Sequence, residues 1–219
     1  MAHQDHYDKD GNKLPTVTQI VECLNKPGIA DWANGLGFKG IRYRSYMTET
    51  ANIGTMVHDR IERELRNEAN WFRDSNVPYK VTECYSRFLT WLHDTKAVGK
   101  YVETPFNNNR YGGTIDAIVE INGALGLVDF KSSKRAYLGH LLQLGGYLNL
   151  IQDTTPSLYE SLSFAQIVAL GNGIKCYTKS IEHMGYYQDL FELLYMTYRA
   201  YCDINEIDWK NNCMEEDPE

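Results

Sequence analysis

Apolar residues recur along the chain with two different periods, and each period predicts one kind of element. A spacing of three to four residues is typical of amphipathic helices, whereas short apolar runs bounded by Gly, Pro or Asn are typical of strands. The pattern predicts, in chain order, helices at 16–24, 52–70 and 82–97, strands at 100–106, 111–121 and 124–131, a helix at 136–152, strands at 163–170 and 174–180, and a helix at 184–202. This alternation predicts an α/β fold.

The same pattern divides the chain into parts. We expect a flexible N-terminal tail at 1–13, an N-terminal helical part at 14–98, a core of sheet and helix at 99–182, and a C-terminal helix with an acidic tail at 183–219. Two helices carry apolar stripes that should face the core. The stripes are Ile53, Met56, Val57, Ile61 and Leu65 in one helix and Leu190, Leu193, Leu194, Tyr198 and Tyr201 in the other.

The two central strands are joined by Asn122-Gly123, a dipeptide suited to a two-residue type I′ hairpin turn. Counting outwards from this turn places Asp116 opposite Asp129 and Thr114 opposite Lys131. Because side chains alternate across a strand, the two aspartates and the lysine should share one face.

Two carboxylates placed opposite each other in an apolar hairpin need an explanation, because like charges at that distance are destabilising. They can share a proton, or they can share a cation. Oxygen ligands favour Mg²⁺ or Mn²⁺, and an ammonium beside the pair suits negative charge that develops on phosphorus. The alternative is structural: Lys131 would bridge Asp116 and Asp129 in a buried salt-bridge cluster.

Four short motifs, taken in order, resemble the PD-(D/E)XK nuclease superfamily. G-x-x-D at 113–116 and D-F-K at 129–131 match its core, G-x-x-x-H at 54–58 matches a preceding helix, and Q-x-x-x-Y at 143–147 matches a following helix. The last two motifs make the chain similar to the RecB-type exonuclease branch. The resemblance implies a restriction-endonuclease-like core with a mixed central sheet flanked by helices and an N-terminal helical lobe.

The resemblance also implies a set of metal ligands. Asp116, Asp129, the carbonyl of Phe130 and His58 would hold Mg²⁺ or Mn²⁺. Glu103 would join them if it projects beside the aspartates, and it is otherwise an exposed strand carboxylate.

Three further residues would act on the substrate. Lys131 would orient the attacking water or stabilise the charge on the phosphate, while Gln143 and Tyr147 would position that phosphate. The alternative for the two helical residues is ordinary packing of the helix on the sheet.

Basic residues outside these motifs are candidate contacts to a nucleic-acid strand. They are Arg42, Arg44, Arg110, Lys134 and Arg135. Arg42 and Arg44 alternate with tyrosines, a pattern that suits phosphate contact and base stacking. A strand or loop with inward tyrosines, and plain solvated charge at Lys134 and Arg135, are the alternatives.

Composition limits the kinds of partner and cofactor that we expect. The net charge of −7 argues against a broad basic surface for duplex DNA. The five cysteines lack zinc-finger spacing and the close grouping of an iron–sulfur cluster, so we predict no cluster and reduced thiols in a cytoplasmic setting, bacterial or phage-infected. No apolar run is long enough for a membrane span. The sequence carries no indication of the oligomeric state.

These observations predict a divalent-metal-dependent deoxyribonuclease, an exonuclease in DNA recombination, repair or phage DNA processing. The alternatives are a structure- or sequence-specific endonuclease with the same site, and a non-catalytic nucleic-acid-binding protein that kept the fold. Cleavage polarity, strand preference and activity on RNA stay open.

Overall fold

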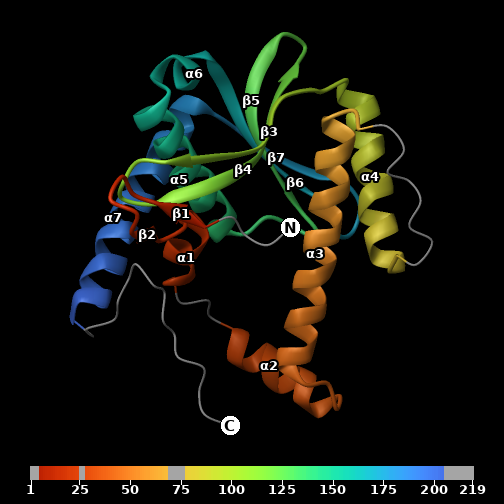
Figure 1. The fold of residues 1–219 in the computed structure, drawn as a ribbon. Helices are drawn as coiled ribbons and strands as arrows, with labels where there is room; N and C mark the ends of the chain where they lie inside the picture. The colour runs from red at the N-terminus through yellow and green to blue at the C-terminus, as the bar shows by residue number, and fades with distance from the viewer. Residues whose placement is uncertain (1–4, 25–27, 69–76, 205–219) are drawn as a thin grey trace.

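The protein is an α/β structure in which one twisted sheet lies between two layers of helices (Figure 1). The computed structural model describes residues 5–24, 28–68 and 77–204. The helices are α1 (Val17–Glu22), α2 (Ile29–Phe38), α3 (Tyr43–Leu65), α4 (Tyr79–Thr95), α5 (Leu138–Thr154), α6 (Pro156–Ser161) and α7 (Ile181–Ile204). The strands are β1 (His6–Tyr7), β2 (Lys13–Leu14), β3 (Val98–Asn107), β4 (Gly112–Ile121), β5 (Ala124–Lys131), β6 (Leu162–Ala169) and β7 (Lys175–Ser180).

The main sheet is mixed, as predicted. Its order is β3-β4-β5-β6-β7, and β5 and β6 are parallel while the other neighbours are antiparallel. Parallel neighbours need a crossover connection, which α5 and α6 provide. At the central hairpin, Asn122 and Gly123 have φ of 51° and 81°, and the predicted register holds from Ile121 opposite Ala124 to Ala117 opposite Val128.

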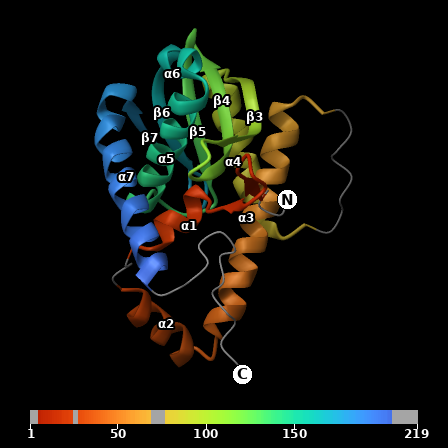
Figure 2. The same ribbon diagram turned by 60° about the vertical axis from the view of Figure 1, so that its left-hand side comes forward.

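Helices cover both faces of the sheet (Figure 2), and each face has its own apolar cluster. On β5, Leu127 packs with α1, α5 and α7, whereas Val128 and Phe130 pack with α3 and α4. Because side chains alternate along β5, those of Asp129 and Lys131 lie on the same face of the sheet as that of Leu127.

The alternation of side chains between the two faces of the sheet is interrupted at one position of β3 and β4. The hairpin pattern did not predict this interruption. Val102 pairs with Ala117 and Thr104 pairs with Ile115, but the pair between them, Glu103 and Asp116, is missing from the ladder. Ala117 packs with the α3–α4 cluster, whereas Ile115 packs with the α1–α5–α7 cluster. Glu103 has a φ of 45°, a left-handed conformation that is uncommon for a residue with a side chain. An irregularity of this kind re-aims side chains.

Helix α3 is longer than predicted, and its first half extends with α2 beyond the sheet layers (Figures 1 and 2). Residues 43–46 are helical, so the strand or loop considered for this stretch is wrong. The Trp32 ring on α2 makes edge-on contacts with Tyr43 and Tyr46 at centroid distances of 5.6 and 5.5 Å. These rings join α2 to the extended end of α3.

Other differences follow from tertiary contacts. Strands β1 and β2 pair within the segment predicted as a flexible tail, and β3 continues through Pro105 because an edge strand tolerates a missing donor. Met56, Leu190, Leu193 and Tyr201 are exposed rather than core-facing. The two short helices α2 and α6 were not predicted.

No helix within the described ranges is both long and apolar enough to cross a bilayer.

We expect Gly145→Ala to destabilise the protein by about 1–3 kcal/mol, the usual cost of overpacking. A Cβ at Gly145 would lie 2.5 Å from the Tyr187 carbonyl oxygen, where α5 crosses α7. The matched control is Gly185→Ala on α7, where a Cβ meets no heavy atom within 4 Å. That change should stabilise by up to about 1 kcal/mol through helix propensity. Thermal unfolding of both variants checks this, and equal melting temperatures would contradict it.

Candidate active site

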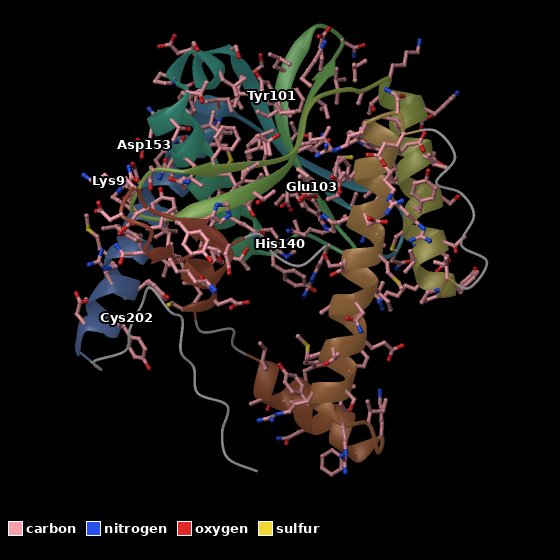
Figure 3. All side chains as sticks on the ribbon, viewed as in Figure 1. Lys9, Tyr101, Glu103, His140, Asp153 and Cys202 are labelled. Atoms are coloured by element: carbon pink, nitrogen blue, oxygen red, sulfur yellow. The ribbon has the colours of Figure 1, made fainter. Side chains whose placement is uncertain are left out.

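An open cleft of about 520 Å³ lies where α3 passes the distorted part of β3 and β4. The side chains that line it come from α1, α3, β3, β4, β5 and α5. Figure 3 labels Glu103 between the sheet and α3, on the wall of this cleft. The cleft brings together seven of the predicted site residues. They are His58, Glu103, Asp116, Asp129, Lys131, Gln143 and Tyr147.

Asp116 is held by two contacts that come from different elements. Its Oδ2 accepts a hydrogen bond from the Phe130 backbone N–H at 2.7 Å, and its Oδ1 lies 3.3 Å from His58 Nδ1 on α3. Burial favours the neutral carboxyl, but His58, Lys131 and the backbone donor outweigh it, so the pKa of Asp116 is lowered. Asp116 is therefore an ionised, fixed ligand candidate.

Asp129 and Lys131 form a second pair on β5. The Lys131 Nζ donates to Asp129 Oδ1 at 3.0 Å and lies 2.9 Å from Oδ2. Asp129 is 2% exposed, and the Lys131 ammonium contacts both of its oxygens. Burial, helped by the charge of Asp116, raises the pKa of Asp129 to about 6 against the opposing effect of Lys131.

Lys131 stays charged in this setting. Burial alone would lower the pKa of its ammonium, but Asp129 and Asp116 outweigh burial and raise it. A cation beside two carboxylates is compatible with the salt-bridge alternative. However, one ammonium does not balance the charge of Asp116, Asp129 and Glu103, which all line this cleft.

His58, Glu103 and Asp116 offer ligand atoms within 4.8 Å of one another. Burial, together with Asp116, raises the pKa of Glu103 to about 7. Burial would lower the pKa of His58, but the neighbouring Asp116 carboxylate raises it overall. Two carboxylates and an imidazole therefore lie close together in a partly buried place, where a cation would offset the negative charge.

A divalent metal fits these residues. The donor set is oxygen-rich, with two carboxylates, one imidazole and Asp129 beside them, and such a set suits Mg²⁺ or Mn²⁺. Asp116 and Asp129 are not neighbours in the ladder, because the pairing of β4 with β5 stops at Ala117. The compact group is therefore His58, Glu103 and Asp116, with Asp129 beside it and tied to Lys131. For Glu103, a place in the cleft favours the ligand interpretation over an exposed strand carboxylate.

The two helical residues reach the cleft from α5. The Gln143 Oε1 accepts a hydrogen bond from Lys131 Nζ at 2.9 Å, and its Nε2 donates to Thr18 Oγ1 at 2.8 Å. Tyr147 is 6% exposed, and its ring leaves no room for a side chain at Gly113, where a Cβ would lie 2.6 Å from Tyr147 Cε1. Glycine at 113 is thus needed for the close approach of this ring.

The side chain of Phe130 faces away from the cleft. Its ring packs edge-on against Phe88 and Trp91 at 5.3 and 5.2 Å. The backbone N–H of Phe130 holds Asp116, and its carbonyl as a metal ligand stays a prediction.

The predicted nucleic-acid contacts are not brought together. Arg110 is bound to Glu192 through two hydrogen bonds of 2.8 and 3.0 Å, outside the cleft, which gives it a structural role. Arg44 is exposed on α3, fourteen positions from His58, or about 21 Å along the helix axis, and Arg42 precedes that helix.

Lys134 and Arg135 are exposed in the loop that follows β5. The Arg135 guanidinium lies 5.1 Å from the centre of the Tyr137 ring. A role in binding a strand stays a prediction for both.

Several residues that line the cleft were not predicted as site residues, and three of them are polar neighbours of the predicted group. Glu62 lies one turn after His58 on α3, a spacing that could have indicated it. Thr114 has a buried hydroxyl without a hydrogen-bond partner in the described part of the chain, and the same G-x-x-D motif contains it. Thr18 comes from a distant helix, and nothing in the local sequence marks it.

Comparisons with known proteins found similarity to solved structures alone. No family model matches the chain, and a search of curated proteins found no similar sequence. Eleven chains of solved structures are similar to it. One of them is a protein from Eubacterium rectale that is provisionally named an exonuclease. The two sequences are 12% identical, the match covers 76% of this chain and 77% of that chain, and the TM-score is 0.46.

We expect Glu103→Gln to stabilise the metal-free protein at high pH. Folding raises the pKa of Glu103 from its ordinary 4.5 to about 7, so the free energy of unfolding falls as pH rises through that window. In EDTA at pH 8 the variant should be more stable by about 1 kcal/mol, allowing for solvent screening of this partly exposed group. At pH 4.5 the two proteins should unfold alike.

Thermal unfolding at both pH values measures this difference. With Mn²⁺ present, the wild type should gain more stability than the variant, because a ligand that binds only the folded state stabilises it. A stability difference that does not change with pH or with Mn²⁺ would contradict the placement of Glu103 in the site.

Proposed function

We propose that the protein is a divalent-metal-dependent deoxyribonuclease that hydrolyses DNA phosphodiester bonds as an exonuclease. One observation carries the proposal: the cleft brings the group of His58, Glu103 and Asp116 together with Asp129, and the Lys131 ammonium lies against Asp129. The resemblance of the same residues to the RecB-type branch supports the choice of DNA and of end-directed cleavage.

In this proposal the cleft residues have two roles, which are to bind the metal ion and to stabilise charge on the phosphate. Asp116, Asp129, Glu103 and His58 would hold Mg²⁺ or Mn²⁺, which acts as a Lewis acid, activates water and neutralises phosphate charge. The Lys131 ammonium, held between Asp129 and Gln143, would place its positive charge beside an oxygen of the phosphate or beside the attacking water.

The acidic net charge fits this division. A polyanion would be repelled from a cleft that is lined by five carboxylates, so binding of DNA there depends on the cation. The chain has no need of a broad basic surface if the metal and Lys131 supply the positive charge at the scissile phosphate.

Asp129→Asn and Lys131→Ala should each lower Mg²⁺-dependent cleavage of end-labelled linear DNA by roughly 10²–10³-fold, the usual cost of losing one group that stabilises transition-state charge. Lys179→Ala is the matched control, because Lys179 is an exposed lysine of β7 that lies outside the cleft. The control should retain wild-type activity, and EDTA should abolish cleavage by every variant.

Full activity of either cleft variant in the presence of metal, or undiminished cleavage in EDTA, would overturn the proposal. A covalently closed circular DNA decides the mode of cleavage. An exonuclease leaves the circle intact while it degrades the linear form, whereas cleavage of the circle assigns endonuclease activity to the same site.

A further inference from the structure

We infer that Thr18 is a positioning residue of this site: its hydroxyl fixes the orientation of the Gln143 side-chain amide, and the amide in turn holds Lys131. The inference rests on the proposed function, because the orientation of Lys131 matters to activity only if Lys131 serves the reaction. Thr18 lies on α1, more than a hundred residues from its partners in the chain.

The direction of each hydrogen bond follows from the chemistry of the groups. An ammonium can only donate, so Lys131 requires the oxygen end of the Gln143 amide, which lies 2.9 Å from Nζ. The nitrogen end then points the other way and needs an acceptor. Thr18 Oγ1 supplies that acceptor at 2.8 Å.

The Thr18 hydroxyl has one hydrogen left to donate, and Tyr147 is its neighbour. A hydrogen bond with Thr18 lowers the pKa of the Tyr147 phenol, although burial, the larger effect, raises it overall. Thr18 therefore contacts both residues of the Q-x-x-x-Y motif, which face the cleft from one side of α5.

Helix α1 is short, but it is held firmly enough to act as a fixed support. Thr16 and Gln19 cap it reciprocally, with hydrogen bonds of 3.2 and 2.8 Å between side chains and backbone. Val17, Ile20 and Val21 are buried in the cluster that includes α5. Thr18 is thus presented to the cleft from a backbone with little freedom.

Without this hydroxyl, the NH₂ group of Gln143 loses its acceptor. The side chain is then free to turn towards another acceptor, and the ammonium would lose the amide oxygen that holds it beside Asp129. Valine has nearly the shape of threonine but neither donates nor accepts, whereas serine keeps the hydroxyl. These two substitutions separate the hydrogen bond from the packing.

The test is steady-state cleavage of end-labelled linear DNA with Mg²⁺. Thr18→Val should lower kcat about tenfold, the scale of one hydrogen bond, and leave KM within about twofold, since the contact orients a group without binding DNA. Thr18→Ser should restore kcat to near the wild-type value. Thr90→Val is the control, because its hydroxyl bonds only within α4 at Ser86, and it should change neither constant.

A double-mutant cycle adds a readout that a purely structural role would not move. In a Gln143→Ala background, Thr18→Val should cause no further loss of kcat, because the amide that Thr18 orients is gone. A second readout is the side-chain amide resonance of Gln143, whose hydrogen exchange should be slow in the wild type and in Thr18→Ser and fast in Thr18→Val.

Wild-type kcat in Thr18→Val, or losses that add fully in the double variant, would overturn the inference while the proposed nuclease activity stands. A wild-type protein that shows no metal-dependent cleavage would overturn the proposed function instead. In that case the Gln143 resonance still reports whether Thr18 holds the amide, and fast exchange in the wild type would reject the contact itself.

Discussion

The hydrogen bond from the Phe130 backbone N–H to the Asp116 carboxylate, at 2.7 Å, is the contact on which the site depends. It takes the place of a backbone-to-backbone bond, since the pairing of β4 with β5 ends just before Asp116. A carboxylate that accepts a hydrogen bond from the backbone of a neighbouring strand cannot point into solvent or into the core. It is held at the sheet surface where α3 passes, and His58 can reach it there.

The distortion on the other side of Asp116 completes this arrangement. Glu103 drops out of the β3–β4 ladder with a left-handed backbone, so one break in the sheet opens around two carboxylates. Residues in sparsely populated conformations persist where the surroundings hold them, and they gather at functional sites. Burial, together with the charge of Asp116, raises the pKa of Glu103 and of Asp129, and a bound cation would offset the cost of ionising both groups.

The sequence predicted what local rules control. The turn at Asn122-Gly123 set the register, the two apolar periods separated sheet from helices, and the spacing of Asp129 and Lys131 placed both on one face. It did not predict the missing pair at Glu103, because a glutamate within a strand gives no local sign of a left-handed backbone. Nor could it find Thr18, whose partners are distant in the chain and whose own helix gives no sign of them.

Two further failures have the same origin. Helix α3 extends beyond its apolar stripe because Trp32 packs on its first turns, a contact that no local pattern reveals. The basic residues looked alike in the sequence, yet Glu192 engages Arg110 on a different side of the domain. Charge alone does not tell a structural ion pair from a substrate contact.

Anomalous scattering from crystals soaked in Mn²⁺ tests the central claim most directly. The account predicts a peak roughly 2 Å from an Asp116 oxygen, with Asp129, Glu103 or His58 completing the ligands. Loss of that peak in Asp116→Asn crystals would complete the result. A soaked crystal without density in the cleft, or with manganese bound only elsewhere on the protein, would contradict it.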